Sequence, residues 1–180
     1  MFWNILQRAA GDNVIVGRIA HETPSAGYRN WALILLATVY AINFIDRQIV
    51  SVLALDLKRD LHLSDADLGF LYGTAFGVFY ALFGIPMGRL ADSWNRVRLI
   101  TAGLAVWSAM TTLSGLSRSG GQLALARIGV GVGEATASPC AYSLISDYFP
   151  KEKRASALAV YSSGMYIGAG LSLFLGATVV

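Results

Sequence analysis

The chain has 180 residues, of which 55% are hydrophobic and 14% are charged, with a formal net charge of +3. A typical soluble domain carries about 25% charged residues, so this chain has too little polar material to cover a water-facing globule. The composition, with a mean hydropathy of +0.54, therefore argues against an ordinary soluble protein and predicts an all-α membrane protein.

The first 28 residues are mixed and polar, and they lack the charged-then-apolar order of a signal peptide. Residues 1–28 are therefore predicted to be a cytoplasmic tail. Cys140 is the only cysteine and the two histidines lie far apart, so neither a disulfide framework nor a metal site is expected.

Apolar segments of about 20 residues, the length that crosses a bilayer, recur along the rest of the chain. Five transmembrane spans are predicted, at residues 31–55, 68–90, 99–116, 122–145 and 155–180, which make residues 29–180 a partial transmembrane bundle. Prolines in the second and fourth spans, Pro86 and Pro139, each remove a backbone hydrogen bond and can kink their helix.

Glycines four residues apart mark several of these spans, and small residues allow helices to approach closely in lipid. Such pairs are Gly73 with Gly77, Gly84 with Gly88, and Gly164 with Gly168. They predict a tightly packed bundle.

Basic residues fix the expected orientation, because Lys and Arg concentrate on the cytoplasmic side. With the tail inside, the predicted cytoplasmic segments hold Arg8, Arg18, Arg29, Arg89, Arg96, Arg98, Lys151, Lys153 and Arg154, and the predicted outer loops hold Lys58, Arg59 and Arg118. The N-terminus is therefore predicted to be cytoplasmic. The chain stops within an apolar run, LSLFLGATVV, so we expect it to be the front part of a longer protein.

Four ionisable residues lie at predicted membrane depth: Asp46, Arg47, Arg127 and Glu134. Each charge costs about 2.5–3.5 kcal/mol at the bilayer centre, and such groups usually face the bundle interior and pair. Two acids and two bases form a neutral set. At about 1.5 Å per residue, Asp46, Arg47 and Glu134 lie roughly 12–16 Å below the outer surface, and Arg127 lies higher.

Asp46 and Arg47 are neighbours about 100° apart around their helix, so each should find its partner on another helix. We expect Arg47 to pair with Glu134. One alternative is that these groups are structural pairs that only orient the first and fourth spans. The other is a polar cavity for substrate or protons, which intramembrane charges generally line.

Burial and a nearby guanidinium act in opposite directions on the proton affinity of a carboxylate. If the bundle moves Arg47 toward and away from an acid, that acid can take up a proton on one side and release it on the other. This predicts proton-coupled transport with Asp46 or Glu134 as the proton carrier. Arg47 or Arg127 can instead bind the anionic group of a substrate, because the guanidinium fork suits carboxylates and phosphates.

Three stretches resemble motifs of the major facilitator superfamily. GRLADSWNRVR between the second and third spans resembles its cytoplasmic signature at Gly88, Asp92 and Arg96, with Ser93 and Asn95 departing from it. ARIGVGVGEATASP is similar to its fourth-helix motif, with Arg127 as the arginine, and SDYFPKEKRASALAVY is similar to its loop into the fifth span, with Pro150 and Arg154 in place.

NFIDRQIVSVL, GVGEA and LISDYFP further resemble the spinster-like branch, whose animal members export sphingosine-1-phosphate and lysophospholipids. The resemblance implies that Asp46, Arg47 and Glu134 form the proton and substrate site, and that Asp92 helps close a cytoplasmic gate. It also implies a twelve-helix transporter in two six-helix halves, of which this chain contains about five helices of the first.

The function expected from the resemblance is secondary active transport, as proton-coupled export or uptake of a small organic anion or an amphipathic lipid-like molecule. Its partners would be membrane lipids, a small-molecule substrate, protons and the missing C-terminal half. The short tail and loops suggest a bacterial inner-membrane protein. No cofactor and no nucleic-acid partner are expected.

A non-transporting membrane fragment that only inserts and associates with partner helices is the alternative. An enzyme is not expected, because no His or Cys/His pair lies within a span to activate a nucleophile, and no strand precedes the glycines at Gly129 to form a phosphate loop. Nothing in the spans resembles the charge rings or the carbonyl filter of a channel.

Overall fold

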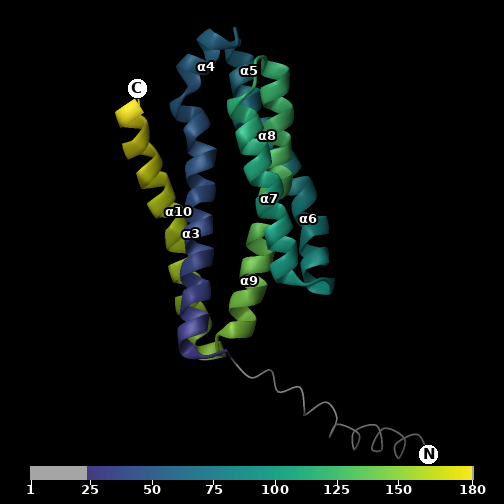
Figure 1. Cartoon of the computed structure of the whole chain (residues 1–180), viewed down its shortest axis with the longest axis vertical. Helices are drawn as coiled ribbons and strands as arrows, with labels where there is room; N and C mark the ends of the chain where they lie inside the picture. Colours follow the sequence, from purple (N-terminus) through teal and green to yellow (C-terminus); the bar gives the residue numbers. More distant parts are fainter. Residues whose placement is uncertain (1–23, 180) are drawn as a thin grey trace, which may run out of the picture.

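A computed structural model describes residues 24–179, which form an elongated helical bundle (Figure 1). Its helices are α3 (Ala26–Val52), α4 (Ala54–Asp60), α5 (Asp65–Gly69), the π-helical η1 (Phe70–Ala75), α6 (Phe76–Ser93), α7 (Arg96–Gly115), α8 (Gly120–Glu134), α9 (Ala137–Tyr148) and α10 (Lys151–Val179). No strand occurs among these residues. The predicted all-α class is confirmed. The tail predicted over residues 1–28 lies mostly outside the described residues.

Three described helices are long and apolar enough to cross a membrane, namely α3, α7 and α10. The other two predicted spans fall on segments that are not single regular α-helices. The second corresponds to α5, η1 and α6, which follow one another without a loop, and the fourth corresponds to α8 and α9, separated by two turn residues.

Pro139 explains the interruption between α8 and α9. A proline ring inside a helix clashes with the carbonyl four residues earlier, which here belongs to Ala135. The helix accordingly stops at Glu134, and α9 begins at Ala137. Pro86 lies within α6 and does not end that helix.

The second interruption lies at η1, where the hydrogen bonds loosen to the π pattern for about one turn. Such π segments are rare and are frequently found beside functional sites. Here η1 ends immediately before Phe76, whose ring contacts Arg47.

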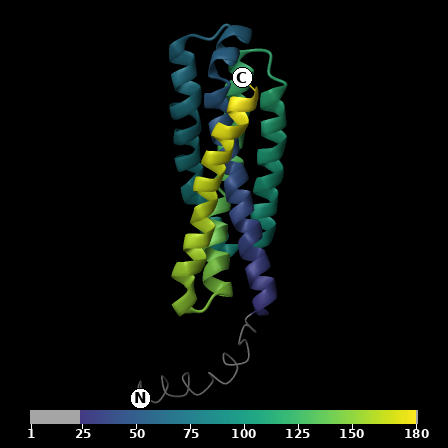
Figure 2. The same ribbon diagram turned by 90° about the vertical axis from the view of Figure 1, so that its left-hand side faces the viewer.

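Helices α3 and α10 lie side by side in both views (Figures 1 and 2), and α7 packs beside α8. Two of the predicted small-residue contacts support the first pair, because a Cβ added at Gly164 or Gly168 would meet the backbone oxygen of Ala37 or Ala41. In contrast, a Cβ at Gly73, Gly77, Gly84 or Gly88 meets no described atom within 4 Å. The glycines of the second span are therefore not packing contacts within the described residues.

A capping box begins α5, at the end of the bundle predicted to lie outside. The Asp67 N–H donates to the Ser64 hydroxyl oxygen at 3.1 Å, and the Ser64 N–H and hydroxyl donate to Asp67 Oδ2 at 2.9 and 2.7 Å. The hydrogen bonds from Ser64 lower the pKa of the Asp67 carboxyl. A lowered pKa contributes stability above the ordinary pKa of aspartate, and this contribution is lost as the pH falls through the lowered value.

Replacing Ser64 with alanine is therefore expected to raise the pKa of Asp67 back toward the ordinary 3.8. The hydroxyl hydrogen bond to the charged carboxylate would be lost, and only the hydrogen bond from the backbone N–H of residue 64 would remain to favour the ionised form. Carbon-13 NMR of the side-chain carboxyl in lipid nanodiscs measures this, with Ser93→Ala as a control at the opposite end of the bundle. An unchanged pKa in Ser64→Ala would contradict the assignment.

Candidate functional site

Glu134 at the C-terminal end of α8 forms an ion pair with Arg47 on α3. Arg47 Nε donates to Glu134 Oε2 at 2.8 Å. Glu134 is 2% exposed, so the charge of its carboxylate would be costly without a partner. The predicted pairing of Arg47 with Glu134 is confirmed.

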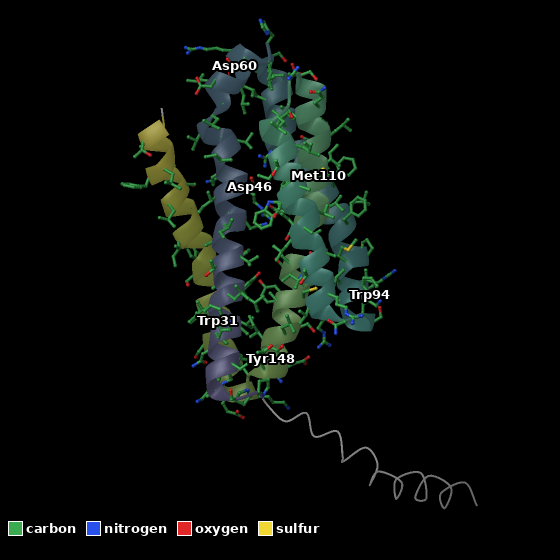
Figure 3. All side chains as sticks on the ribbon, viewed as in Figure 1. Trp31, Asp46, Asp60, Trp94, Met110 and Tyr148 are labelled. Atoms are coloured by element: carbon green, nitrogen blue, oxygen red, sulfur yellow. The ribbon has the colours of Figure 1, made fainter. Side chains whose placement is uncertain are left out.

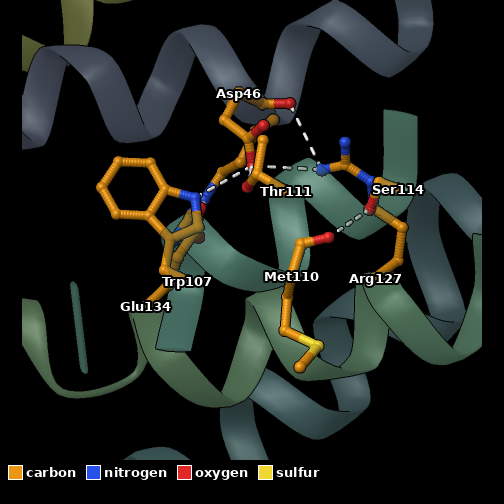
Figure 4. A network of polar contacts seen from close by, with 8 residues as sticks. Asp46, Trp107, Met110, Thr111, Ser114, Arg127 and Glu134 are labelled. Carbon is orange, nitrogen blue, oxygen red and sulfur yellow. Dashed lines mark hydrogen bonds and ion pairs between the residues drawn. The ribbon is translucent and has the colours of Figure 1, made fainter. Parts of the chain in front are cut away.

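Asp46, the neighbour of Arg47, turns toward α7 and α8 (Figure 4). Its Oδ2 accepts hydrogen bonds from Arg127 Nη1 at 3.1 Å, Trp107 Nε1 at 3.1 Å and Thr111 Oγ1 at 3.3 Å. Asp46 and Arg127 are 7% and 6% exposed. The two acids and two bases thus form two ion pairs between α3 and α8, of which Asp46–Arg127 is buried on both sides and Arg47–Glu134 is buried at Glu134 and partly exposed at Arg47.

Asp46 lies near mid-height of the bundle (Figure 3), between Trp31 and Asp60 toward opposite ends. The estimate from helical rise placed Arg127 nearer the outer surface than Asp46, without pairing them. Arg127 nevertheless pairs with Asp46, through Nη1 at 3.1 Å from Oδ2.

Three aromatic rings surround the guanidinium of Arg47. Its Cζ lies 5.3 Å from the ring centre of Phe44, 4.8 Å from that of Phe76 and 4.7 Å from that of Tyr80. A guanidinium within about 6 Å of a ring face is attracted to it. The rings stabilise the cation and leave it 26% exposed, so Arg47 is the accessible member of its pair.

Trp107 and Thr111 were missed by the sequence analysis. They lie four residues apart in the third span, and therefore on one helix face. A buried indole N–H usually finds a hydrogen-bond acceptor, which was a usable signal for Trp107. No comparable signal singles out Thr111, because a threonine inside a span commonly bonds to its own helix.

A cavity of about 150 Å³ opens beside the two arginines. Its lining residues are Arg47, Gln48, Val50, Ser51, Leu71, Phe76 and Arg127. The described lining includes two arginines and no acidic residue. The cavity is therefore suited to an anionic group rather than a cation.

A wider, mostly apolar groove of about 620 Å³ runs along the other side of Asp46, between α3 and α7. Its polar lining consists of Asp46, Ser108 and Thr111. Asp46 thus lines this groove while its carboxylate is held by Arg127.

The predicted gate motif lies at the end of the bundle that carries the α6–α7 and α9–α10 loops. Arg96 pairs with Asp147 of α9 and donates from Nε to the Ala91 carbonyl at 3.3 Å. Asp92 is exposed and has no ion pair with a described residue. A Cβ added at Gly88 would meet no described atom within 4 Å. Arg96 is therefore the member of the motif that joins two helices.

The loop before α10 brings Pro150 and Arg154 together. The Pro150 carbonyl accepts from the N–H groups of Lys153 and Arg154 at 2.9 and 3.2 Å, which starts the helix. Arg154 Nε donates back to the Phe149 carbonyl at 3.0 Å. Both residues fix the turn between α9 and α10.

Comparison with known proteins gives a family match over most of the chain. The family model described as Major Facilitator Superfamily matches residues 36–180. A solved bacterial homologue of the human lysosomal transporter Spinster, in an inward-facing and occupied conformation, is similar with 42% identity and a TM-score of 0.81. The match covers 84% of this chain and 33% of that protein.

Curated relatives give the same result. An MFS-type efflux pump of Mycolicibacterium smegmatis is 38% identical over 82% of this chain and 35% of its own length. A probable L-galactonate transporter of Escherichia coli is 30% identical over 87% of this chain and 34% of its own length. Protein spinster homolog 1 of Xenopus tropicalis is 33% identical over 91% of this chain and 32% of its own length. The chain spans about a third of the length of these relatives.

Proposed function

Because the chain belongs to the major facilitator superfamily and resembles its spinster-like branch, we propose that it forms the first spans of a proton-coupled secondary transporter. Its cargo would be a small organic anion or an amphipathic, lipid-like molecule with an anionic group. Protons, membrane lipids and the C-terminal half of the same transporter would be its partners. The location proposed is a bacterial inner membrane, with the N-terminus in the cytoplasm.

The observation that carries this proposal is the set of two ion pairs between α3 and α8, beside a cavity whose lining includes Arg47 and Arg127. A purely structural pair needs no access. Arg47, however, is partly exposed and lines the cavity, while its partner Glu134 is buried. An arriving anion can therefore compete with Glu134 for Arg47.

This competition gives a coupling mechanism. While Arg47 holds Glu134, the carboxylate stays ionised. When an anion takes Arg47, Glu134 loses its counter-charge in a buried place, where a free carboxylate is costly, and it binds a proton instead. Substrate binding and proton uptake then favour one another, which is the coupling that symport requires.

Asp46 has a different proposed part in the mechanism. Its carboxylate has three donors, and its partner Arg127 is almost fully buried, so the second pair is held more firmly than the first. We assign Glu134 as the first proton carrier and Asp46 as the acid that holds Arg127 beside the cavity. Asp46 can exchange a proton only when Arg127 moves.

The gate residues act at the proposed cytoplasmic end. Arg96 and Asp147 join the start of α7 to α9, while Pro150 and Arg154 fix the next turn. We propose that this end opens and closes as a unit when the transporter changes its access, with Gly88 and Asp92 at the meeting point with the C-terminal half.

A non-transporting fragment is the second candidate, because the chain spans about a third of the length of its relatives. The two candidate functions are distinguished by reconstituting two proteins in proteoliposomes. One is the purified chain, and the other is the protein encoded by the complete reading frame. Absence of uptake by both under a proton gradient would favour the fragment.

The mechanism itself is tested with galactonate as the anionic probe. Glu134→Gln in the complete reading frame is expected to abolish gradient-driven accumulation while keeping exchange of labelled for unlabelled probe, since glutamine keeps the shape but cannot carry the proton. Asp46→Asn is expected to reduce both activities, because Arg127 loses its partner. Lys58→Ala, an exposed pair member, is the matched control. Full accumulation by Glu134→Gln would contradict the proposed proton carrier.

A further inference from the structure

Asn43 is a fully buried polar residue on α3 to which the mechanism above gives no role. It is 1% exposed, and neither its Nδ2 nor its Oδ1 has a hydrogen-bond partner within the described part of the chain. Glu134 Oε1, the oxygen that Arg47 does not hold, is likewise buried and without such a partner. Buried polar atoms in folded proteins nearly always have hydrogen-bond partners. The Asn43 amide and Glu134 Oε1 are therefore candidates to pair with each other.

The fold brings Asn43 and Glu134 together. Asn43 precedes Arg47 by four residues, so both side chains leave the same face of α3, one turn apart. Arg47 on that face reaches Glu134 Oε2. The Asn43 amide lies close enough to Glu134 to interact with its carboxylate. The Asn43 amide and Glu134 Oε1 are thus two buried polar groups without a hydrogen-bond partner among the described residues, beside the Arg47–Glu134 pair.

The other ionisable groups around this point are few. Arg47 and Asp46 of α3 interact with Glu134, Arg127 comes from the same helix as Glu134 and is held by Asp46, and Tyr80 of α6 lies over Arg47. The guanidinium groups can only donate hydrogen bonds, so neither of them can accept the O–H that a protonated Glu134 carries.

We propose that Asn43 is a positioning residue that holds Glu134 in both of its protonation states. To the ionised carboxylate, the Asn43 Nδ2–H donates. To the protonated acid, the Asn43 Oδ1 accepts from the new O–H. A primary amide carries both a donor and an acceptor, so a half turn about its last side-chain bond exchanges one role for the other. Glu134 thus keeps a partner when Arg47 leaves it.

The inference rests on the proposed function only for the assumption that Glu134 takes up a proton. Its test does not require transport. The chain is labelled with nitrogen-15 at asparagine and placed in lipid nanodiscs, and the side-chain amide signal of Asn43 is assigned through Asn43→Leu. The signal is then followed by NMR as the pH is changed, in parallel with the infrared carboxyl band of Glu134.

The Asn43 amide signal is expected to move over the same pH range in which the Glu134 band changes, and to stop moving in Glu134→Gln. Ser114→Ala is the matched control, because Ser114 is also buried in a span but donates to Met110 of its own helix, and its loss should leave the movement intact. A purely packing role for Asn43 predicts no movement. An amide signal that ignores the titration, or that moves equally in Glu134→Gln, would overturn the proposal.

Transport provides a separate readout. If galactonate uptake fails in every variant while the amide signal follows Glu134, the proposed function is wrong and the role of Asn43 stands. If uptake proceeds and the signal does not follow Glu134, the role of Asn43 is wrong and the transporter stands.

Discussion

Replacing Arg127 with leucine is expected to lower the free energy of unfolding by about 3–5 kcal/mol, the cost typical of breaking a buried ion pair from one side. Arg127 is 6% exposed and its Nη1 lies 3.1 Å from Asp46 Oδ2. Removing it leaves the Asp46 carboxylate among apolar neighbours, with only the neutral donors Trp107 and Thr111. Titration with dodecyl sulfate in mixed micelles measures this loss.

The double variant Asp46→Leu with Arg127→Leu separates the ion pair from simple packing. A buried pair replaced on both sides by apolar groups often costs little, so the double variant should be more stable than Arg127→Leu alone. Lys58→Ala is the exposed counterpart, since Asp65 in that pair is 86% exposed, and its loss should cost less than about 1 kcal/mol. Equal instability of the single and double variants would show that the arginine acts only by filling space.

Replacing Gly168 with alanine is expected to cost about 1–3 kcal/mol or more, because a new methyl group must enter a filled contact. Its Cβ would meet the Ala41 carbonyl oxygen and would lie 2.9 Å from Phe44 Cβ. Backbone cannot move aside as a flexible side chain can, so α10 must shift away from α3. The free energy of unfolding measured in the same micelles reports the cost.

Gly170 in the same helix is the matched control. A Cβ added there meets no described atom within 4 Å, so Gly170→Ala should leave stability unchanged or slightly higher, since alanine favours helix over glycine. A disulfide between cysteines introduced on α3 and α10 should form more slowly in Gly168→Ala than in Gly170→Ala. Similar stability of the two variants would contradict the close approach of these helices. Gly168→Ala should also disturb the ion-pair site, because the Phe44 side chain lies against both Gly168 and Arg47.

The pairing of Arg47 with Glu134 could be predicted because charges are rare in this sequence. In a low-dielectric span each one needs a partner, and few choices exist. The aromatic shell around Arg47 could not be predicted in the same way. Phe76 and Tyr80 are ordinary span residues in the sequence, and only the rotation of α6 after η1 decides that they face Arg47.

The pairing of Asp46 with Arg127 shows a similar limit. Helical rise gives the level of each Cα but not the reach of a long side chain, and so it placed the two groups apart. The interruption at Ala135 and Thr136 could be predicted only in part. Pro139 indicated that the helix would be disturbed, but not whether it would bend or stop.

Sequence by itself determined that this protein is a helical membrane bundle and that four charges must be satisfied inside it. Both features follow from composition, span length and the cost of isolated charge, which act locally on the chain. The likeness to the major facilitator proteins came separately, from three short motifs. Tertiary structure alone decided which oxygen each donor reaches, which arginine remains accessible, and where Asn43 lies. The two ion pairs join residues more than 80 positions apart, and the contacts around them depend on helix rotation and close packing, which no local pattern encodes.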